Sequence, residues 1–132
     1  MDRNKNYPHH IKLGKFGERL AQKNLIKEGY KIIQTNYKEK WGEIDIIASF
    51  KNLLVFVEVK TIINENFYLK NSPLLPEDQI TFKKLKNLNQ TILYYLNKNH
   101  LESDYRLDVI AIEINPILKK YRLRHLKGID EN

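Results

Sequence analysis

The sequence predicts a single α/β domain, because helical and strand-like hydrophobic patterns follow one another along the chain. The expected order is a helix, three strands, a second helix, and one or two further strands. A chain of 132 residues is long enough to bury one core. Residues 1–12 are expected to form a flexible N-terminal leader, and residues 13–132 the domain itself.

The first helix is predicted from Leu13 to Glu28, and Gly29 is expected to end it. Leu13, Phe16 and Leu20 recur at helical spacing and form the predicted apolar stripe. Three strands are expected next, at Tyr30–Tyr37, Glu43–Ala48 and Leu53–Lys60. The last of them is apolar on both faces for most of its length, which is typical of a central strand covered on both sides.

The second half of the chain begins with a predicted loop, Thr61–Leu75, which has no clear period. Pro76 is expected to open the second helix, with Glu77 and Asp78 in its first turn. The buried stripe of this helix is predicted to be Leu85, Leu88, Ile92 and Leu96, and its end near Asn97–Asn99. A strand at Tyr105–Ile114 and an edge strand at Lys119–Leu126 complete the expected order.

The composition narrows the classes of function. The net charge of +7 favours a polyanionic partner such as nucleic acid, although a lysine- and asparagine-rich genome could produce the same balance. The absence of cysteine excludes disulfides and thiolate metal sites. No apolar run approaches the roughly 20 residues of a membrane span, and no signal-peptide core begins the sequence. A cytoplasmic protein without a membrane partner is therefore expected.

Two short strings place charges in stretches that otherwise resemble buried strands: GEID at residues 42–45 and FVEVK at residues 56–60. Residues two apart on a strand share a face, so Glu58 and Lys60 point the same way. An ionised carboxylate in an apolar interior must be paired, hydrogen-bonded or bound to metal. The two strings therefore predict a functional site.

The chemistry of this set fits metal-assisted hydrolysis of a phosphodiester. Asp45 and Glu58 lie on successive strands and could converge on one Mg²⁺ or Mn²⁺ ion, which prefer such oxygen ligands. Lys60 could orient or help to deprotonate the attacking water and contact the reacting phosphate. The alternative is a buried ion pair that serves structure alone, which explains less well why all three residues are present.

The sequence leaves the roles of two further acids open. Glu43 shares its face with Asp45 and either joins the site or lies at the strand edge in water. Glu18 lies about 200° around the first helix from Phe16, and either supplies a further ligand or is a solvated helix carboxylate.

Three basic side chains are candidates for contact with nucleic acid. Lys83 and Lys86 lie on one stripe of the second helix and could bind phosphates or simply face solvent. Arg106 could do the same, or could pair with Asp108 two residues later, and the pairing is slightly favoured.

Together, GEIDIIA at residues 42–48 and VFVEVK at residues 55–60 resemble the YraN-like family of endonucleases. This family belongs to the PD-(D/E)xK nuclease superfamily and is similar to the archaeal Holliday-junction resolvases. The likeness spans roughly Gly14 to Leu126. It also includes Gly17-Glu18, Leu20-Ala21, Gly29-Tyr30, Asn36-Tyr37, Lys83 and the RLDVI string at residues 106–110.

The resemblance implies a restriction-endonuclease-like core, a mixed β-sheet flanked by helices. It implies Asp45 and Glu58 as metal ligands, Lys60 as the catalytic lysine, and Glu18 as a helix acid that joins the site. The implied activity is Mg²⁺-dependent cleavage of DNA, including branched or structured DNA. A homodimer would place two sites on the two strands of a junction. The alternative is a non-catalytic nucleic-acid-binding module that retains the nuclease core.

Overall fold

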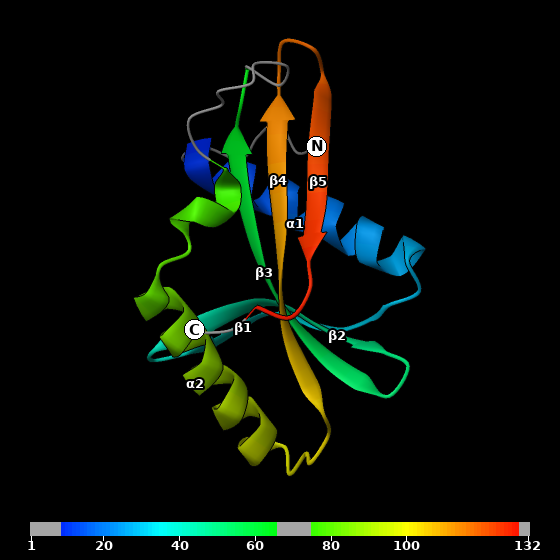
Figure 1. Cartoon of the computed structure of the whole chain (residues 1–132), viewed down its shortest axis with the longest axis vertical. Coiled ribbons are helices and arrows are strands. Elements are labelled where there is room, and N and C mark those ends of the chain that lie inside the picture. The colour runs from blue at the N-terminus through cyan, green and yellow to red at the C-terminus, as the bar shows by residue number, and fades with distance from the viewer. Residues whose placement is uncertain (1–8, 66–74, 130–132) are drawn as a thin grey trace.

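A computed structural model describes residues 9–65 and 75–129. In these ranges, a five-stranded sheet lies between two α-helices, and a short 3₁₀ turn precedes the second helix (Figure 1). The elements are α1 His9–Lys27, β1 Lys31–Glu39, β2 Gly42–Phe50, β3 Leu53–Ile63, η1 Pro76–Gln79, α2 Phe82–Lys98, β4 Tyr105–Asn115 and β5 Lys120–Leu126. The predicted order of elements is confirmed.

The strands lie in the sheet in sequence order, from β1 to β5. Neighbouring strands are antiparallel except β3 and β4, which are parallel because η1 and α2 carry the chain back between them. The sheet is therefore mixed and flanked by helices, as predicted. Its centre, β3, is covered on both faces.

One core cluster lies between α1 and the sheet, behind the sheet in Figure 1. Ala21 and Leu25 of α1 pack there against Val55 and Val57 of β3. The predicted stripe of Leu13, Phe16 and Leu20 is wrong as the main contact of this helix. Phe16 is exposed and Leu20 only partly buried, because the helix turns the face that carries Ala21 and Leu25 toward the sheet.

A second cluster lies between α2 and the opposite face of the sheet, in front of the sheet in Figure 1. The predicted stripe is confirmed, since Leu88, Ile92 and Leu96 are buried there and Leu85 packs against them. Their partners on the sheet are the apolar residues Ile44, Ile47, Phe56 and Leu107.

Helix α1 begins at His9, four residues before the expected start. Residues 9–12 of the predicted leader are therefore helical, and residues 1–8 lie outside the described residues. Strand β3 continues to Ile63, past the expected Lys60, because it stays paired with β4. The rest of the predicted loop, residues 66–74, lies outside the described part of the chain.

The predicted start of the second helix at Pro76 is wrong. Pro76 opens only the 3₁₀ turn η1, and α2 begins after Thr81, whose side chain accepts a hydrogen bond from the Lys84 backbone N–H. This is the usual chemistry of a helix N-cap. Glu77 lies in η1 and pairs with Arg124 of β5 instead of entering the first turn of α2.

Candidate active site

The site lies where β2 and β3 part. Their backbones pair from Phe50 and Leu53 as far as Ile46 and Val57, and the ladder ends there. Beyond that point β2 stays paired with β1 alone, and β3 with β4 alone. The sheet thus forks, and the first residues past the fork are Asp45 on one arm and Glu58 on the other.

The side chain of Asp45 links β2 to β3 just past the fork. Its Oδ2 accepts a 2.7 Å hydrogen bond from the backbone N–H of Val59, where the strand ladder no longer supplies a partner from β2. Glu58 is only 6% exposed, and its Oε1 lies 3.4 Å from Nζ of Lys84 on α2. Both carboxylates are therefore held in place.

The surroundings disfavour the ionised form of both acids. Burial, together with the negative charge of Glu58, raises the pKa of Asp45 to about 8. Burial also raises the pKa of Glu58, while the ammonium group of Lys84 opposes that rise. A buried and a partly buried carboxylate that repel each other fit a divalent cation, because its charge would stabilise both.

Other acids lie within electrostatic reach of this pair. The charge of Glu43 raises the pKa of Glu18, Asp45 and Glu58, so Glu43 belongs to the same acidic group. Burial raises the pKa of Glu18 on α1, and the charge of Lys15 and a hydrogen bond with Asn36 oppose that rise. Glu18, Glu43 and Glu58 therefore all lie within electrostatic reach of Asp45.

The described structure limits how many side chains could bind a metal ion at this site. Within residues 9–65 and 75–129, no three histidine, aspartate or glutamate side chains are arranged to hold a metal ion. Mg²⁺ is commonly bound through one or two carboxylates and retains several waters. The pair of Asp45 and Glu58 meets that requirement, and Glu18 and Glu43 lie around it.

Two glycines let the helices approach the fork. A Cβ atom on Gly17 of α1 would overlap the side chain of Thr61 on β3. A Cβ atom on Gly42, the first residue of β2, would overlap Oγ1 of Thr91 on α2. Each of the two strands that form the fork thus packs against one helix so closely that the glycine position has no room for a side chain.

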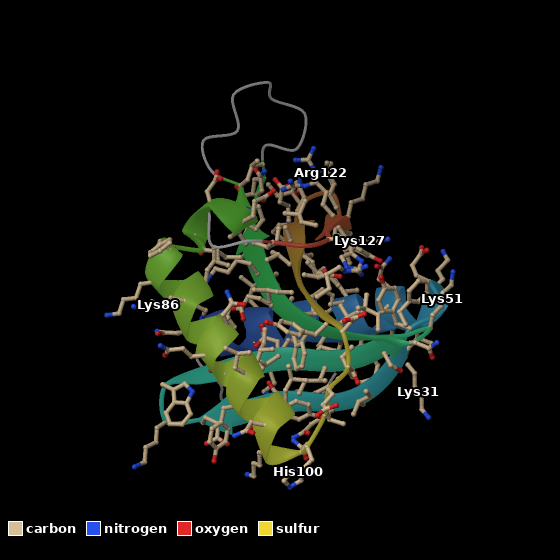
Figure 2. All side chains as sticks on the ribbon, turned by 60° about the horizontal axis from the view of Figure 1, so that its bottom comes forward. Lys31, Lys51, Lys86, His100, Arg122 and Lys127 are labelled. Carbon is tan, nitrogen blue, oxygen red and sulfur yellow. The ribbon has the colours of Figure 1, made fainter. Side chains whose placement is uncertain are left out.

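The lysines divide into two groups. Lys60 lies near Glu58, since its charge lowers the pKa of that acid. Lys84 contacts Glu58 directly. The lysines predicted from the sequence were its neighbours on the helix, Lys83 and Lys86. Lys83 and Lys86 are exposed, and Lys86 projects from α2 away from the sheet (Figure 2). Adjacent helix residues differ by about 100° in direction, so only the packing of α2 shows which lysine meets the site.

Arg106 lies in a separate network. Its guanidinium donates hydrogen bonds to both oxygens of buried Asp108 and to the hydroxyl of Tyr30. Asp108 also contacts Nε2 of His125 and accepts from the backbone N–H of Gly128. These contacts favour the structural interpretation of Arg106, because its Nε and Nη2 donors already have partners in the protein.

The fold and site define a mixed α/β protein with a pair of carboxylates, one buried and one partly buried, at a fork in its sheet. The chain belongs to the family described as "Uncharacterised protein family UPF0102", whose model matches residues 17–112. The matched segment contains the fork and both carboxylates. Membership in the YraN-like family, predicted from the sequence, is thereby confirmed.

Several relatives align over most of their length. A UPF0102 protein of Sulfurihydrogenibium sp. (strain YO3AOP1) is 43% identical over 105 residues, which cover 79% of this chain and 86% of the relative. A UPF0102 protein of Alkaliphilus oremlandii is 37% identical over 118 residues, which cover 89% and 96% respectively. Within the described residues, neither helix has the length and apolar character needed to cross a membrane.

Proposed function

We propose that this protein is a Mg²⁺- or Mn²⁺-dependent endonuclease that hydrolyses DNA phosphodiester bonds, with a restriction-endonuclease-like core. The observation that carries the proposal is the pair of partly buried Asp45 and buried Glu58 at the fork, with Lys60 two residues farther along β3. A sheet interior rarely holds two carboxylates and a lysine unless they form a functional site, because buried charges destabilise the fold unless they are compensated.

Asp45 and Glu58 are the residues that would hold the cation. Their oxygens are the hard ligands that Mg²⁺ and Mn²⁺ prefer, and their raised pKa values reflect a site that lacks sufficient positive charge of its own. When bound, the cation would polarise the phosphoryl oxygen and lower the pKa of the attacking water. The Val59 N–H would keep the Asp45 carboxylate oriented toward it.

The lysines supply the remaining functions. Lys60 would orient the attacking water and contact the reacting phosphate, since it follows Glu58 at the spacing that places both on one face of β3. Lys84 would offer a second ammonium group to the same phosphate. The net charge of +7 suits a DNA substrate, because it favours association with a polyanion.

The test is a cleavage panel with linear, flapped and four-way-junction DNA in Mg²⁺ or Mn²⁺. We expect Asp45→Asn, Glu58→Gln and Lys60→Ala each to lower the cleavage rate by roughly 10²–10³-fold, the usual loss when one charged stabiliser is removed. Lys51→Ala is the matched control, because Lys51 is an exposed lysine in the turn that joins β2 to β3, the strands that carry the site (Figure 2).

Two outcomes would contradict the proposal. Cleavage that survives all three substitutions would show that this site does not carry the activity. Salt-dependent DNA binding without cleavage in either metal would instead favour the non-catalytic binding module.

A further inference from the structure

A pair of exposed aromatic rings lies on the same side of α2 as the fork. Trp41, in the turn between β1 and β2, packs edge-to-face on Tyr94 of α2, with 5.1 Å between ring centroids and 79° between planes. Each residue keeps 39% of its surface exposed. Two large rings from separate elements thus meet at the surface.

The hydrophobic core does not account for this pair. The neighbouring Tyr95 is buried and packs with Tyr37 and Phe56 in the cluster beneath α2. Trp41 and Tyr94 lie outside the residues that make up the two core clusters. Their contact therefore shapes the surface more than it stabilises the interior.

Contacts along one edge of α2 connect the pair to the candidate active site. From the start of the helix to its end, Lys84 meets Glu58, Thr91 meets Gly42, and Tyr94 meets Trp41. Ten helix residues separate Lys84 from Tyr94, about 15 Å along the axis. Four strand residues separate Trp41 from Asp45, about 13 Å. Both measures place the rings about 13–15 Å from the carboxylates.

The charges around the rings suit a nucleic-acid strand. Nζ of Lys98 lies 5.9 Å from the centre of the Tyr94 ring, and Lys40 is exposed beside Trp41. Glu39 balances part of this charge through a 3.9 Å contact with Lys98. Aromatic faces next to lysines are how proteins bind single strands, with bases on the rings and phosphates on the ammonium groups.

We propose that Trp41 and Tyr94 form a stacking subsite for an unpaired base of DNA. The inference rests on the proposed nuclease function and deepens it, since it assigns a substrate class. Bases within a duplex are already stacked on each other, so only an unpaired nucleotide can offer its face to these rings. The preferred substrate is therefore DNA with a single-stranded segment close to the bond that is cleaved, such as a flap.

The protein contains its own probe, because Trp41 is its single tryptophan. Asp45→Asn protein without metal is titrated with a single-stranded oligonucleotide, a flapped duplex and a blunt duplex while tryptophan fluorescence is recorded. We expect the single strand and the flap to quench the fluorescence, and the blunt duplex to leave it nearly unchanged. Tyr94→Ala should weaken binding of the single strand by roughly tenfold, measured by anisotropy of a labelled oligonucleotide.

Tyr121→Ala is the matched control. Tyr121 is 52% exposed on β5, and its neighbour Arg122 lies at the far end of the molecule from the β1–β2 turn (Figure 2). This variant should bind the single strand as tightly as the unsubstituted protein. Circular dichroism of both tyrosine variants checks that each remains folded.

The results separate the subsite from the nuclease function. DNA that binds without changing the fluorescence, or with equal quenching by the blunt duplex, would overturn the subsite while leaving cleavage unaffected. A loss in Tyr121→Ala as large as in Tyr94→Ala would overturn it as well. If the single strand and the flap quench the fluorescence selectively but the unsubstituted protein cleaves no DNA, the result would support the subsite and contradict the nuclease function.

Discussion

The Oδ2 atom of Asp45 accepts a 2.7 Å hydrogen bond from the Val59 N–H, across the point where β2 and β3 stop pairing. A side chain thus replaces the missing backbone acceptor of the neighbouring strand. This contact keeps the backbone of the fork satisfied, and it holds a carboxylate beside Glu58 at a cost in stability.

Asp45→Asn should stabilise the metal-free protein at neutral and alkaline pH. The amide oxygen can still accept from Val59, and the variant avoids ionising a partly buried group whose pKa is raised to about 8. A carboxyl with a raised folded-state pKa makes stability fall as pH rises from its unfolded value of 3.8 toward 8. The gain should therefore exceed about 1 kcal/mol near pH 8 and vanish near pH 4.

Urea denaturation in the presence of a chelator, at pH 4, 6 and 8, measures this gain. Asp104→Asn is the control, because Asp104 is exposed and lies before β4. A variant less stable than the native protein at every pH would show that the hydrogen bond outweighs the burial of charge.

Gly17→Ala and Gly14→Ala should have opposite effects on stability, although both lie in α1. A methyl group at Gly17 overlaps Thr61, so we expect a loss of roughly 1–3 kcal/mol as α1 moves away from β3. A methyl group at Gly14 meets nothing within 4 Å, so replacing a helical glycine there should gain about 0.5–1 kcal/mol. Thermal unfolding of the two variants tests the close approach, and equal shifts would contradict it.

Gly42→Ala should be destabilising on its own and largely rescued by Thr91→Ala. The added methyl overlaps Oγ1 of Thr91, whereas its other neighbours, including the Asn87 carbonyl oxygen at 3.4 Å, can be accommodated by small shifts. A double-mutant cycle in urea should show a favourable coupling of about 1 kcal/mol or more. Additive losses would mean that the overlap with Oγ1 of Thr91 is not what excludes a side chain at this position.

Asp108→Asn should lower stability by about 3 kcal/mol at pH 7, because it leaves Arg106 without its carboxylate partner. Burial acts to raise the pKa of Asp108, but hydrogen bonds from His125, Arg106 and Gly128 outweigh it and lower the pKa below 3.8. The stabilising contribution is therefore complete above pH 3.8 and is lost as pH falls through the folded-state pKa. Unfolding followed from pH 7 to pH 3 should show the two proteins converging, and a constant gap would exclude the charge as its cause.

Much of the fold was predictable from hydrophobic spacing. The stripe of Leu88, Ile92 and Leu96 identified the face of α2 that meets the sheet, because only that face could bury enough apolar area. The same reasoning failed for α1, where Phe16 appeared to be a core residue. The packing favoured Gly17 and Ala21, because small side chains let the helix lie closer to β3.

The candidate site was predictable as a set of residue types but not as a geometry. Charges in apolar strands singled out Asp45 and Glu58, since burial of such groups needs a reason. Lys84 was missed because it differs from Lys83 only in its direction from the helix axis, which depends on how α2 packs.

The sequence by itself determined the order of helices and strands, the identity of the central strand and the acids that the protein places in its interior. Local periodicity and the free energy of burying charge suffice for these. The tertiary structure alone decided where β2 leaves β3, which lysine meets Glu58, and that Trp41 meets Tyr94. These depend on contacts between residues distant in the chain, which the local sequence pattern does not encode.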